Sequence, residues 1–317
     1  MNNSHTKELH DQIEKDLEAS QKSNDTEDRF ETLVYGHLSM ILAHFFIRIR
    51  FSANTVTLLS LVFGVFGSFF FYSQNLLINF IGILIEFFAV LLDCADGQVA
   101  RLTHTSSQLG RFLDGLVDSV NFAAIYIALG LRMMNERIPF TGLKWSWGIW
   151  IVIFISGYCH AEQARMADYF RSLHLHFLNQ YNTAFFTTSD KIRKELSESR
   201  NTPLYNRIYL AVYYLYTKAQ EMMSPNTQKL LNSIEENGGE ISEELSEAFT
   251  SKSRKYVQLT NVLTFNLRAY ALFLLILLRL HPWFFLFNIF VLGGIMIFMV
   301  TRYEGIAKEV YDEWFAK

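Results

Sequence analysis

The stretch LLDCADGQVARLTHTSSQLGRFLDGLVD, residues 91–118, places four aspartates within two apolar segments. In the first segment, the spacing of Asp93 and Asp96 puts both side chains on one face of a helix. In the second segment, the spacing of Asp114 and Asp118 also puts them on one helical face. The stretch therefore predicts two neighbouring helices, each with an acidic face.

A polar break at residues 103–107 separates the two helices. Thr105 and Gln108 have the spacing of a capping box, in which two side chains satisfy the free backbone groups at a helix start. The second helix is therefore expected to begin there. A turn this short allows the two acidic faces to meet, which would bring the four carboxylates together.

The composition favours a membrane protein. Of the 317 residues, 50% are hydrophobic and 15% aromatic, and the mean hydropathy is positive. The apolar residues gather in runs long enough to cross a hydrocarbon core of about 30 Å. The net charge of −3 is close to neutral and points to no nucleic-acid partner. We predict an all-α integral membrane protein with a bundle of six transmembrane helices, at residues 53–73, 76–95, 111–132, 145–165, 266–280 and 283–301.

Two polar or amphipathic regions lie outside these spans. Residues 28–50 carry apolar side chains at helical spacing and end in arginines, which predicts an N-terminal amphipathic juxtamembrane helix on the membrane surface. An ordinary packed helix fits that pattern equally. Residues 172–256 form a helical insert rich in lysine and arginine, so the positive-inside tendency places it in the cytoplasm. Within it, residues 203–223 are amphipathic and aromatic-rich, which indicates a surface or partner-contacting helix rather than a seventh span.

The predicted organisation follows the chain in five parts. They are a polar cytosolic tail at 1–27, the juxtamembrane helix at 28–50, catalytic transmembrane helices 1 to 4 at 51–171, the cytoplasmic insert at 172–256, and transmembrane helices 5 and 6 with the C-terminal tail at 257–317.

Four ionised carboxylates in one place require countercharge, and bound metal supplies it economically. An all-oxygen ligand set favours Mg²⁺ or Mn²⁺ over zinc, which prefers histidine or cysteine. Two such ions would neutralise a diphosphate and polarise the bond being broken. Gly97, Ala100 and Gly110 are small enough for a nucleotide diphosphate to approach the backbone. Arg101 offers a planar fork for phosphate oxygens.

A family pattern matches these residues. They resemble the complete signature of the CDP-alcohol phosphotransferase family, also called the CDP-alcohol phosphatidyltransferase family, as Asp93-x2-Asp96-Gly97-x2-Ala100-Arg101-x8-Gly110-x3-Asp114-x3-Asp118. Residues 53–57, ANTVT, are similar to the Pro-Asn-x-x-Thr opening of the family's first helix, with alanine in place of proline. The resemblance implies a six-helix membrane core that forms a homodimer, with its site open to the cytoplasm.

The resemblance also implies roles for the site residues. Asp93, Asp96 and Asp114 would bind the metal ions, while Asp118 would be the general base and also touch a metal. The residues expected to contact CDP are Asn54, Asp93, Gly97, Ala100, Arg101 and Gly110.

The expected reaction is the metal-dependent transfer of a substituted phosphate group from a CDP-activated donor to an alcohol, with release of CMP, in phospholipid or sphingolipid headgroup synthesis. We favour a CDP-linked lipid donor and a polar acceptor such as inositol, inositol phosphate, glycerol phosphate or serine. One alternative is a choline or ethanolamine phosphotransferase that uses CDP-choline or CDP-ethanolamine with diacylglycerol or a ceramide. A divalent-cation transporter is the alternative from another class, because acids inside spans also form cation paths.

Acceptor choice depends on basic residues near the membrane boundary. Two interpretations are open. These side chains bind an anionic acceptor, or they lie at the membrane boundary and extend their charged ends to the lipid headgroups. The candidate acceptor-binding residues are Arg165, Asp168, Arg171 and Arg268. We expect a multi-pass protein with its active site facing the cytoplasm, in a bacterial inner membrane rather than an internal eukaryotic membrane.

Overall fold

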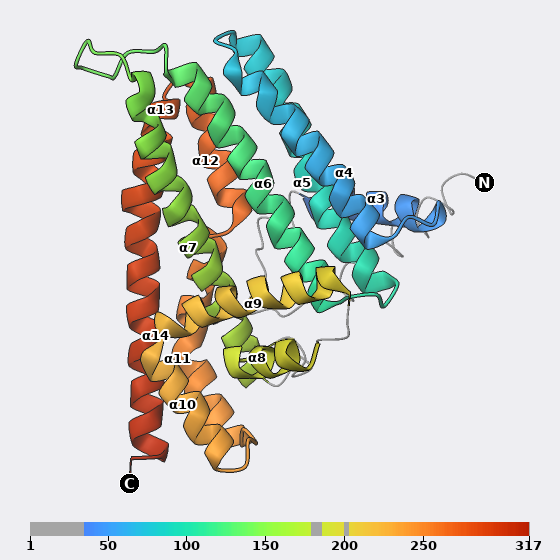
Figure 1. Ribbon diagram of the computed structural model, residues 1–317, viewed down its shortest axis with the longest axis vertical. Coiled ribbons are helices and arrows are strands. Elements are labelled where there is room, and N and C mark those ends of the chain that lie inside the picture. The colour runs from blue at the N-terminus through green and yellow to red at the C-terminus, as the bar shows by residue number, and fades with distance from the viewer. Residues whose placement is uncertain (1–34, 179–185, 200–202, 317) are drawn as a thin grey trace. The chain divides into compact units, whose positions relative to one another are not determined.

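The computed structural model describes residues 35–178, 186–199 and 203–316. This part of the chain is helical and contains no β-strand (Figure 1). A 3-10 turn, η2, follows α4, and a π-helical turn, η6, joins α13 to α14. The elements are α3 (His37–Arg48), α4 (Ala53–Ser68), η2 (Phe69–Tyr72), α5 (Leu76–Leu102), α6 (Gln108–Met133), α7 (Ile149–Phe177), α8 (Ser189–Glu198), α9 (Leu204–Met222), α10 (Pro225–Glu236), α11 (Glu243–Val262), α12 (Phe265–Leu277), α13 (His281–Leu286), η6 (Phe287–Leu292) and α14 (Gly293–Trp314).

Five segments are long and apolar enough to cross a membrane, and they support a multi-pass membrane fold. The fourth predicted span, 145–165, overlaps α7 and is not among the five, so the count of six stays a prediction. The fifth predicted span, 266–280, overlaps a much longer helical segment made of α11 and α12. The five segments are Ala53–Tyr72, Leu76–Leu102, Leu109–Met133, Glu243–Leu277 and His281–Trp314.

The predicted tail, 1–27, and the first residues of the predicted juxtamembrane helix, 28–34, lie outside the described residues. The rest of that helix is α3, which packs beside α5 and buries Phe46. Leu38 and Phe45 on another face of α3 are exposed. An exposed apolar face is expected of a helix that lies on a membrane, and this role of α3 stays a prediction.

Contacts divide the chain into two compact units. The first contains α3 to α6, the beginning of α7 up to Ala161, and residues 265–290 with α12 and α13. The second contains α7 from Glu162 onward, α8 to α11, and α14. The functional division into five parts stays a prediction; most of the insert, 172–256, falls in the second unit.

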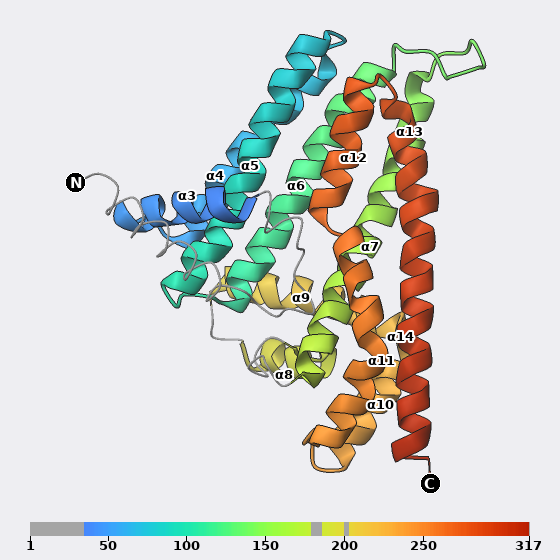
Figure 2. The same cartoon turned by 180° about the vertical axis from the view of Figure 1, so that it is seen from behind.

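Helices α4 and α5 lie side by side in the first unit (Figures 1 and 2). They approach closely because glycines face the contact. A Cβ atom added at Gly82 would lie 2.7 Å from the Cβ atom of Phe70 and 3.1 Å from the carbonyl oxygen of Gly67. Membrane helices commonly pack through such small residues, because these let the backbones come together.

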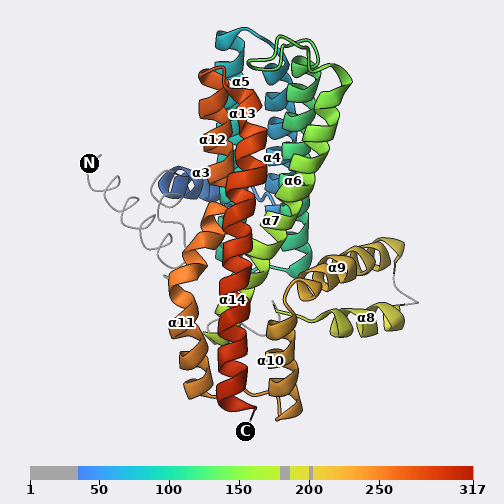
Figure 3. The same cartoon turned by 90° about the vertical axis from the view of Figure 1, so that its left-hand side faces the viewer.

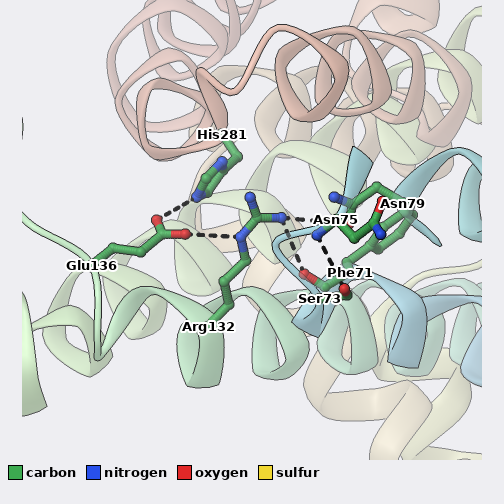
Figure 4. A network of polar contacts seen from close by, with 7 residues as sticks. All are labelled: Phe71, Ser73, Asn75, Asn79, Arg132, Glu136 and His281. Carbon is green, nitrogen blue, oxygen red and sulfur yellow. Dashed lines mark hydrogen bonds and ion pairs between the residues drawn. The ribbon is translucent and has the colours of Figure 1, made fainter. Parts of the chain in front are cut away.

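A polar network links several helices to one another at one end of this unit (Figure 4). The Nε atom of Arg132 donates to Glu136 Oε1 at 2.9 Å, and Nη1 donates to the Phe71 carbonyl and to Asn79 Oδ1, each at 3.4 Å. The second oxygen of Glu136 pairs with His281 Nε2 at 2.7 Å. Side chains and backbone from η2, α5, α6, the loop after α6 and α13 are thereby linked, so the network fixes one end of the helical bundle.

The second unit has its own aromatic core. The rings of Phe170 and Tyr303 stack with centroids 4.3 Å apart, and those of Phe177 and Phe249 with centroids 4.0 Å apart. Helices α10 and α11 run beside α14 (Figure 3). The insert is therefore packed onto the last helix of the chain.

Candidate active site

The turn between α5 and α6 reverses the chain within five residues, 103–107. The Thr103 hydroxyl pairs with that of Thr105 at 2.8 Å, and the Thr105 backbone N–H donates to the Ala100 carbonyl at 2.9 Å. His104 adopts the left-handed backbone region with φ 54°, which is uncommon for a residue other than glycine. These contacts hold the end of α5 beside the start of α6.

Helix α6 begins at Gln108, but its N-cap differs from the one predicted. The Ser107 hydroxyl accepts from the Gly110 backbone N–H at 3.0 Å, so Ser107 is the cap. The capping role predicted for Thr105 was wrong, because the Thr105 side chain pairs with Thr103 at the end of α5 instead.

Three aspartates come together where the two helices meet. Asp93 and Asp96 come from α5 and Asp114 comes from α6, and one carboxylate oxygen of each lies within 4.8 Å of the others. Asp96 is buried, while Asp93 and Asp114 are partly buried. The predicted meeting of the two acidic faces therefore occurs for these three residues.

Asp118 lies one turn further along α6 and is not in this group of three. It interacts electrostatically with Asp93, so it lies next to the group. Its predicted roles as general base and metal contact stay predictions.

The donor chemistry of the group fits a divalent cation. Asp93 Oδ1 and Asp96 Oδ2 are buried and have no hydrogen-bond partner in the described part of the protein. A buried carboxylate oxygen without a partner is costly, and three close carboxylates repel one another. Oxygen ligands of this kind suit Mg²⁺ or Mn²⁺.

The predicted CDP contacts come from α4 and from the two helices that carry the aspartates. The guanidinium of Arg101 lies over Gly97, where Nη1 would be 3.2 Å from an added Cβ atom. The side-chain oxygen Oδ1 of Asn54 would be 3.8 Å from a Cβ atom added at Gly110. The start of α4 is thus brought to the start of α6. Ala100 lies on α5 between Gly97 and Arg101 and is partly buried.

Thr57 was not among the predicted site residues. Its side chain lies in hydrogen-bonding contact with Asp96, and it is buried. The threonine that closes the motif at residues 53–57 was the available signal, since a motif threonine at membrane depth has to find a polar neighbour.

The four candidate acceptor residues divide between the two units. Arg268, on α12, belongs to the first unit, is fully buried and interacts electrostatically with Asp118. In the second unit, Arg165 pairs with Glu162. Arg171 Nη2 donates to the Asn261 side-chain oxygen Oδ1 at 2.6 Å.

Asp168 is the remaining acceptor candidate. It is partly buried on α7, in the second unit. The described residues therefore associate only Arg268 with the aspartates.

The fold and the acidic group define a multi-pass helical membrane protein with a cluster of aspartates suited to divalent metal. Residues 50–167 match the profile of the CDP-alcohol phosphatidyltransferase family. Residues 50–167 therefore match a CDP-alcohol phosphatidyltransferase domain, and the family resemblance inferred from the residues is confirmed for this region. The members of this family transfer substituted phosphate groups.

One curated relative also matches. An uncharacterized protein of Aquifex aeolicus (strain VF5) is 36% identical over 98 residues, which are 31% of this chain and 48% of the relative. The chain thus spans about half the length of the relative it matches. No solved structure gives a significant match.

Proposed function

We propose that this protein transfers a substituted phosphate group from a CDP-activated donor to an alcohol and releases CMP. One observation carries the proposal: Asp93, Asp96 and Asp114 converge within 4.8 Å from two helices joined by a short turn, inside the region that matches the family. A pyrophosphate needs such a concentration of cation-binding groups, whereas a structural ion pair would need a basic partner for each acid.

In the proposed reaction, Asp118 takes the proton from the acceptor hydroxyl. The oxygen then attacks the β-phosphorus of the donor, the bond from that phosphorus to the bridging oxygen breaks, and CMP leaves with the electron pair. Asp93, Asp96 and Asp114 would hold divalent metal, which when bound offsets the charge of the pyrophosphate and of the leaving CMP. Arg101 adds a fixed positive charge beside Gly97.

For the substrates, we propose a CDP-linked lipid as donor and a polar alcohol as acceptor. Support comes from Arg268, a buried guanidinium in electrostatic interaction with Asp118. A positive charge beside the general base favours an acceptor that carries a phosphate, such as an inositol phosphate or glycerol phosphate. The proposal includes two metal ions, a homodimer, six spans and a site that faces the cytoplasm of a bacterial inner membrane.

The purified protein in nanodiscs tests the reaction. It is incubated with Mg²⁺ or Mn²⁺ and either a CDP-diacylglycerol donor or CDP-choline, each with a panel of acceptors, and CMP release is measured. We expect CMP release with the lipid donor and a polar acceptor, and none after chelation. CMP release only from CDP-choline with diacylglycerol or a ceramide would overturn the substrate assignment, and no CMP from any pair would overturn the proposed reaction.

Two variants test the roles of the acids. Asp118→Asn should abolish turnover while binding of the CDP substrate is retained, because the amide cannot accept the proton. Asp93→Ala should lose the metal-dependent activity altogether. Full turnover by Asp118→Asn would refute the base assignment.

A further inference from the structure

Helix α9, Leu204–Met222, carries an apolar stripe that the other described residues of the second unit leave uncovered. Ile208 is 56% exposed, Leu215 66% and Met222 76%. Leu204 and Val212 are also exposed, and all five recur at helical spacing on one side of the helix. Scattered exposed apolar residues are ordinary, but a continuous stripe along a helix marks an interaction surface.

The opposite side of α9 is occupied by protein. Leu210, Thr217 and Gln220 are buried, and the Gln220 side chain donates to the Arg165 carbonyl at 3.0 Å. Helix α8 packs against α9 within the same unit. The stripe therefore belongs to a helix whose other faces are already anchored, so the direction of the stripe within the second unit is fixed.

The position of α9 along α14 sets its depth. Helix α10 follows α9 after two residues, and Glu304 of α14 accepts from the first backbone N–H groups of α10. Glu304 Oε2 accepts from Asn226 N at 2.7 Å, and Oε1 accepts from Thr227 N at 3.0 Å. Glu304 lies just after the apolar run GGIMIFMV, residues 293–300, ends. The end of α9 is therefore held at the level where α14 leaves the apolar core of the bilayer.

The orientation of α9 also fits a position at the boundary of the membrane. Within the second unit α9 runs crosswise to α14, as Figures 1 and 3 both show. A helix that crosses a spanning helix at the boundary lies along the plane of the membrane. Arg207 and Lys218 are exposed and follow one edge of the apolar stripe, where side chains of an interfacial helix meet lipid phosphates.

We propose that the α9 stripe, Leu204, Ile208, Val212, Leu215 and Met222, inserts into the bilayer surface of the leaflet where α14 ends. The stripe then lies at the boundary between headgroups and acyl chains, and Arg207 and Lys218 contact anionic headgroups. The insert is thereby a membrane-bound element rather than a freely solvated one. The inference depends on α14 spanning the membrane and is independent of the proposed reaction.

Spin labels attached to single cysteines test the proposal on the full chain. Ile208→Cys and Leu215→Cys place a label on the stripe, and Lys194→Cys on exposed α8 is the control. Each variant is studied in nanodiscs of phosphatidylcholine with phosphatidylglycerol, and wild-type protein treated alike gives the signal from Cys94 and Cys159. Power saturation then compares collisions with oxygen, which concentrates in lipid, and with a water-soluble nickel chelate.

We expect oxygen to relax the labels at 208 and 215 more than the nickel chelate does, and the reverse order at 194. Labels at 208 and 215 that collide mainly with nickel would show a solvated helix. Labels shielded from both reagents would show that the stripe is covered by protein, such as a partner, a second copy or another part of this chain. Either result overturns the proposal.

Discussion

Arg268 is a buried charge whose surroundings suggest a use in substrate selection. Its Cζ atom lies 6.0 Å from the centroid of the Phe122 ring, and the guanidinium interacts electrostatically with Asp118. A guanidinium held in place in this way binds an anionic group through charge-assisted hydrogen bonds, each of which contributes roughly 1.5–3 kcal/mol.

For Arg268→Gln we therefore expect the KM for a phosphorylated acceptor to rise about tenfold or more, with little change for a neutral acceptor. Steady-state CMP release with both kinds of acceptor measures the effect. Arg279→Gln, at an exposed position in the same unit, is the matched control. An equal fall of kcat for every acceptor would instead mean that Arg268 acts through Asp118 and does not bind the acceptor.

We expect Glu136 to make the stability of the protein depend on pH in the acid range. Partial burial alone would raise its pKa, but the hydrogen bond and charge of His281, with those of Arg132, bring the pKa below its ordinary value of 4.5. A lowered carboxyl pKa stabilises the folded state at pH values above 4.5, and this contribution is lost as the pH falls through the lower, folded value.

Thermal unfolding at a series of pH values compares the wild type with Glu136→Gln. The stability advantage of the wild type should be complete near neutral pH and should shrink as the pH falls below 4.5. A constant difference across the acid range would contradict the assignment.

The aspartates show which parts of the candidate site can be predicted from the sequence. Asp93, Asp96 and Asp114 were predicted to converge, because helical spacing fixes the face on which each lies, and they do. The neighbour Thr57 was missed, because its contact with Asp96 depends on how α4 packs against α5. Spacing within one helix predicts a face, but it does not predict which residue of another helix covers that face.

At the scale of elements, the contact between α4 and α5 depends on Gly82. An added Cβ atom would lie 3.1 Å from a backbone oxygen, that of Gly67, which cannot rotate away. Gly82→Ala should therefore separate the two helices and destabilise the protein by about 1–3 kcal/mol. Gly294→Ala is the control, since nothing lies within 4 Å of its added Cβ atom, and alanine is a better helix former than glycine.

Thermal unfolding in detergent checks this pair. The unfolding temperature should fall for Gly82→Ala and stay equal or rise for Gly294→Ala. If Gly82→Ala unfolds at the wild-type temperature, the close approach of the two helices is not needed for stability.

Helices were easier to predict than their ends. The long apolar runs indicated α4, α5 and α6, because each is dominated by apolar residues, but the predicted span 76–95 stops short of the end of α5 at Leu102. The start of α6 was assigned to the wrong cap, since Thr105 and Ser107 are both residue types that cap helices and the fold of the turn selects Ser107.

At the scale of the whole molecule, the two units were not predictable from hydropathy. The division separates α12 and α13 from α14, although the sequence places them in one C-terminal pair of spans. The reason for this division lies in side-chain contacts of long sequence separation, such as Glu304 with the start of α10 and Phe249 with Tyr303. These contacts attach the insert to α14, and no local pattern in either segment specifies the partner.

We also expect the acidic group to make the stability of the whole protein depend on metal. Without bound cation, Asp93, Asp96 and Asp114 repel one another. A ligand that binds only the folded state stabilises it, by about 2.7 kcal/mol at a concentration 100 times its dissociation constant. We therefore expect Mg²⁺ or Mn²⁺ to raise the unfolding temperature of the wild type, and chelation to lower it.

Asp96→Asn separates metal binding from other causes of this effect. The amide keeps the shape of the side chain but removes one negative charge, so the metal-free variant should be more stable than the metal-free wild type and should gain much less from added metal. Asp312→Asn, an exposed acid on α14, is the control and should keep the full gain. Calorimetry of the three proteins, with metal and with chelator, gives the comparison. An undiminished gain in Asp96→Asn would mean that the cation binds elsewhere, and the acidic group would then need another source of countercharge.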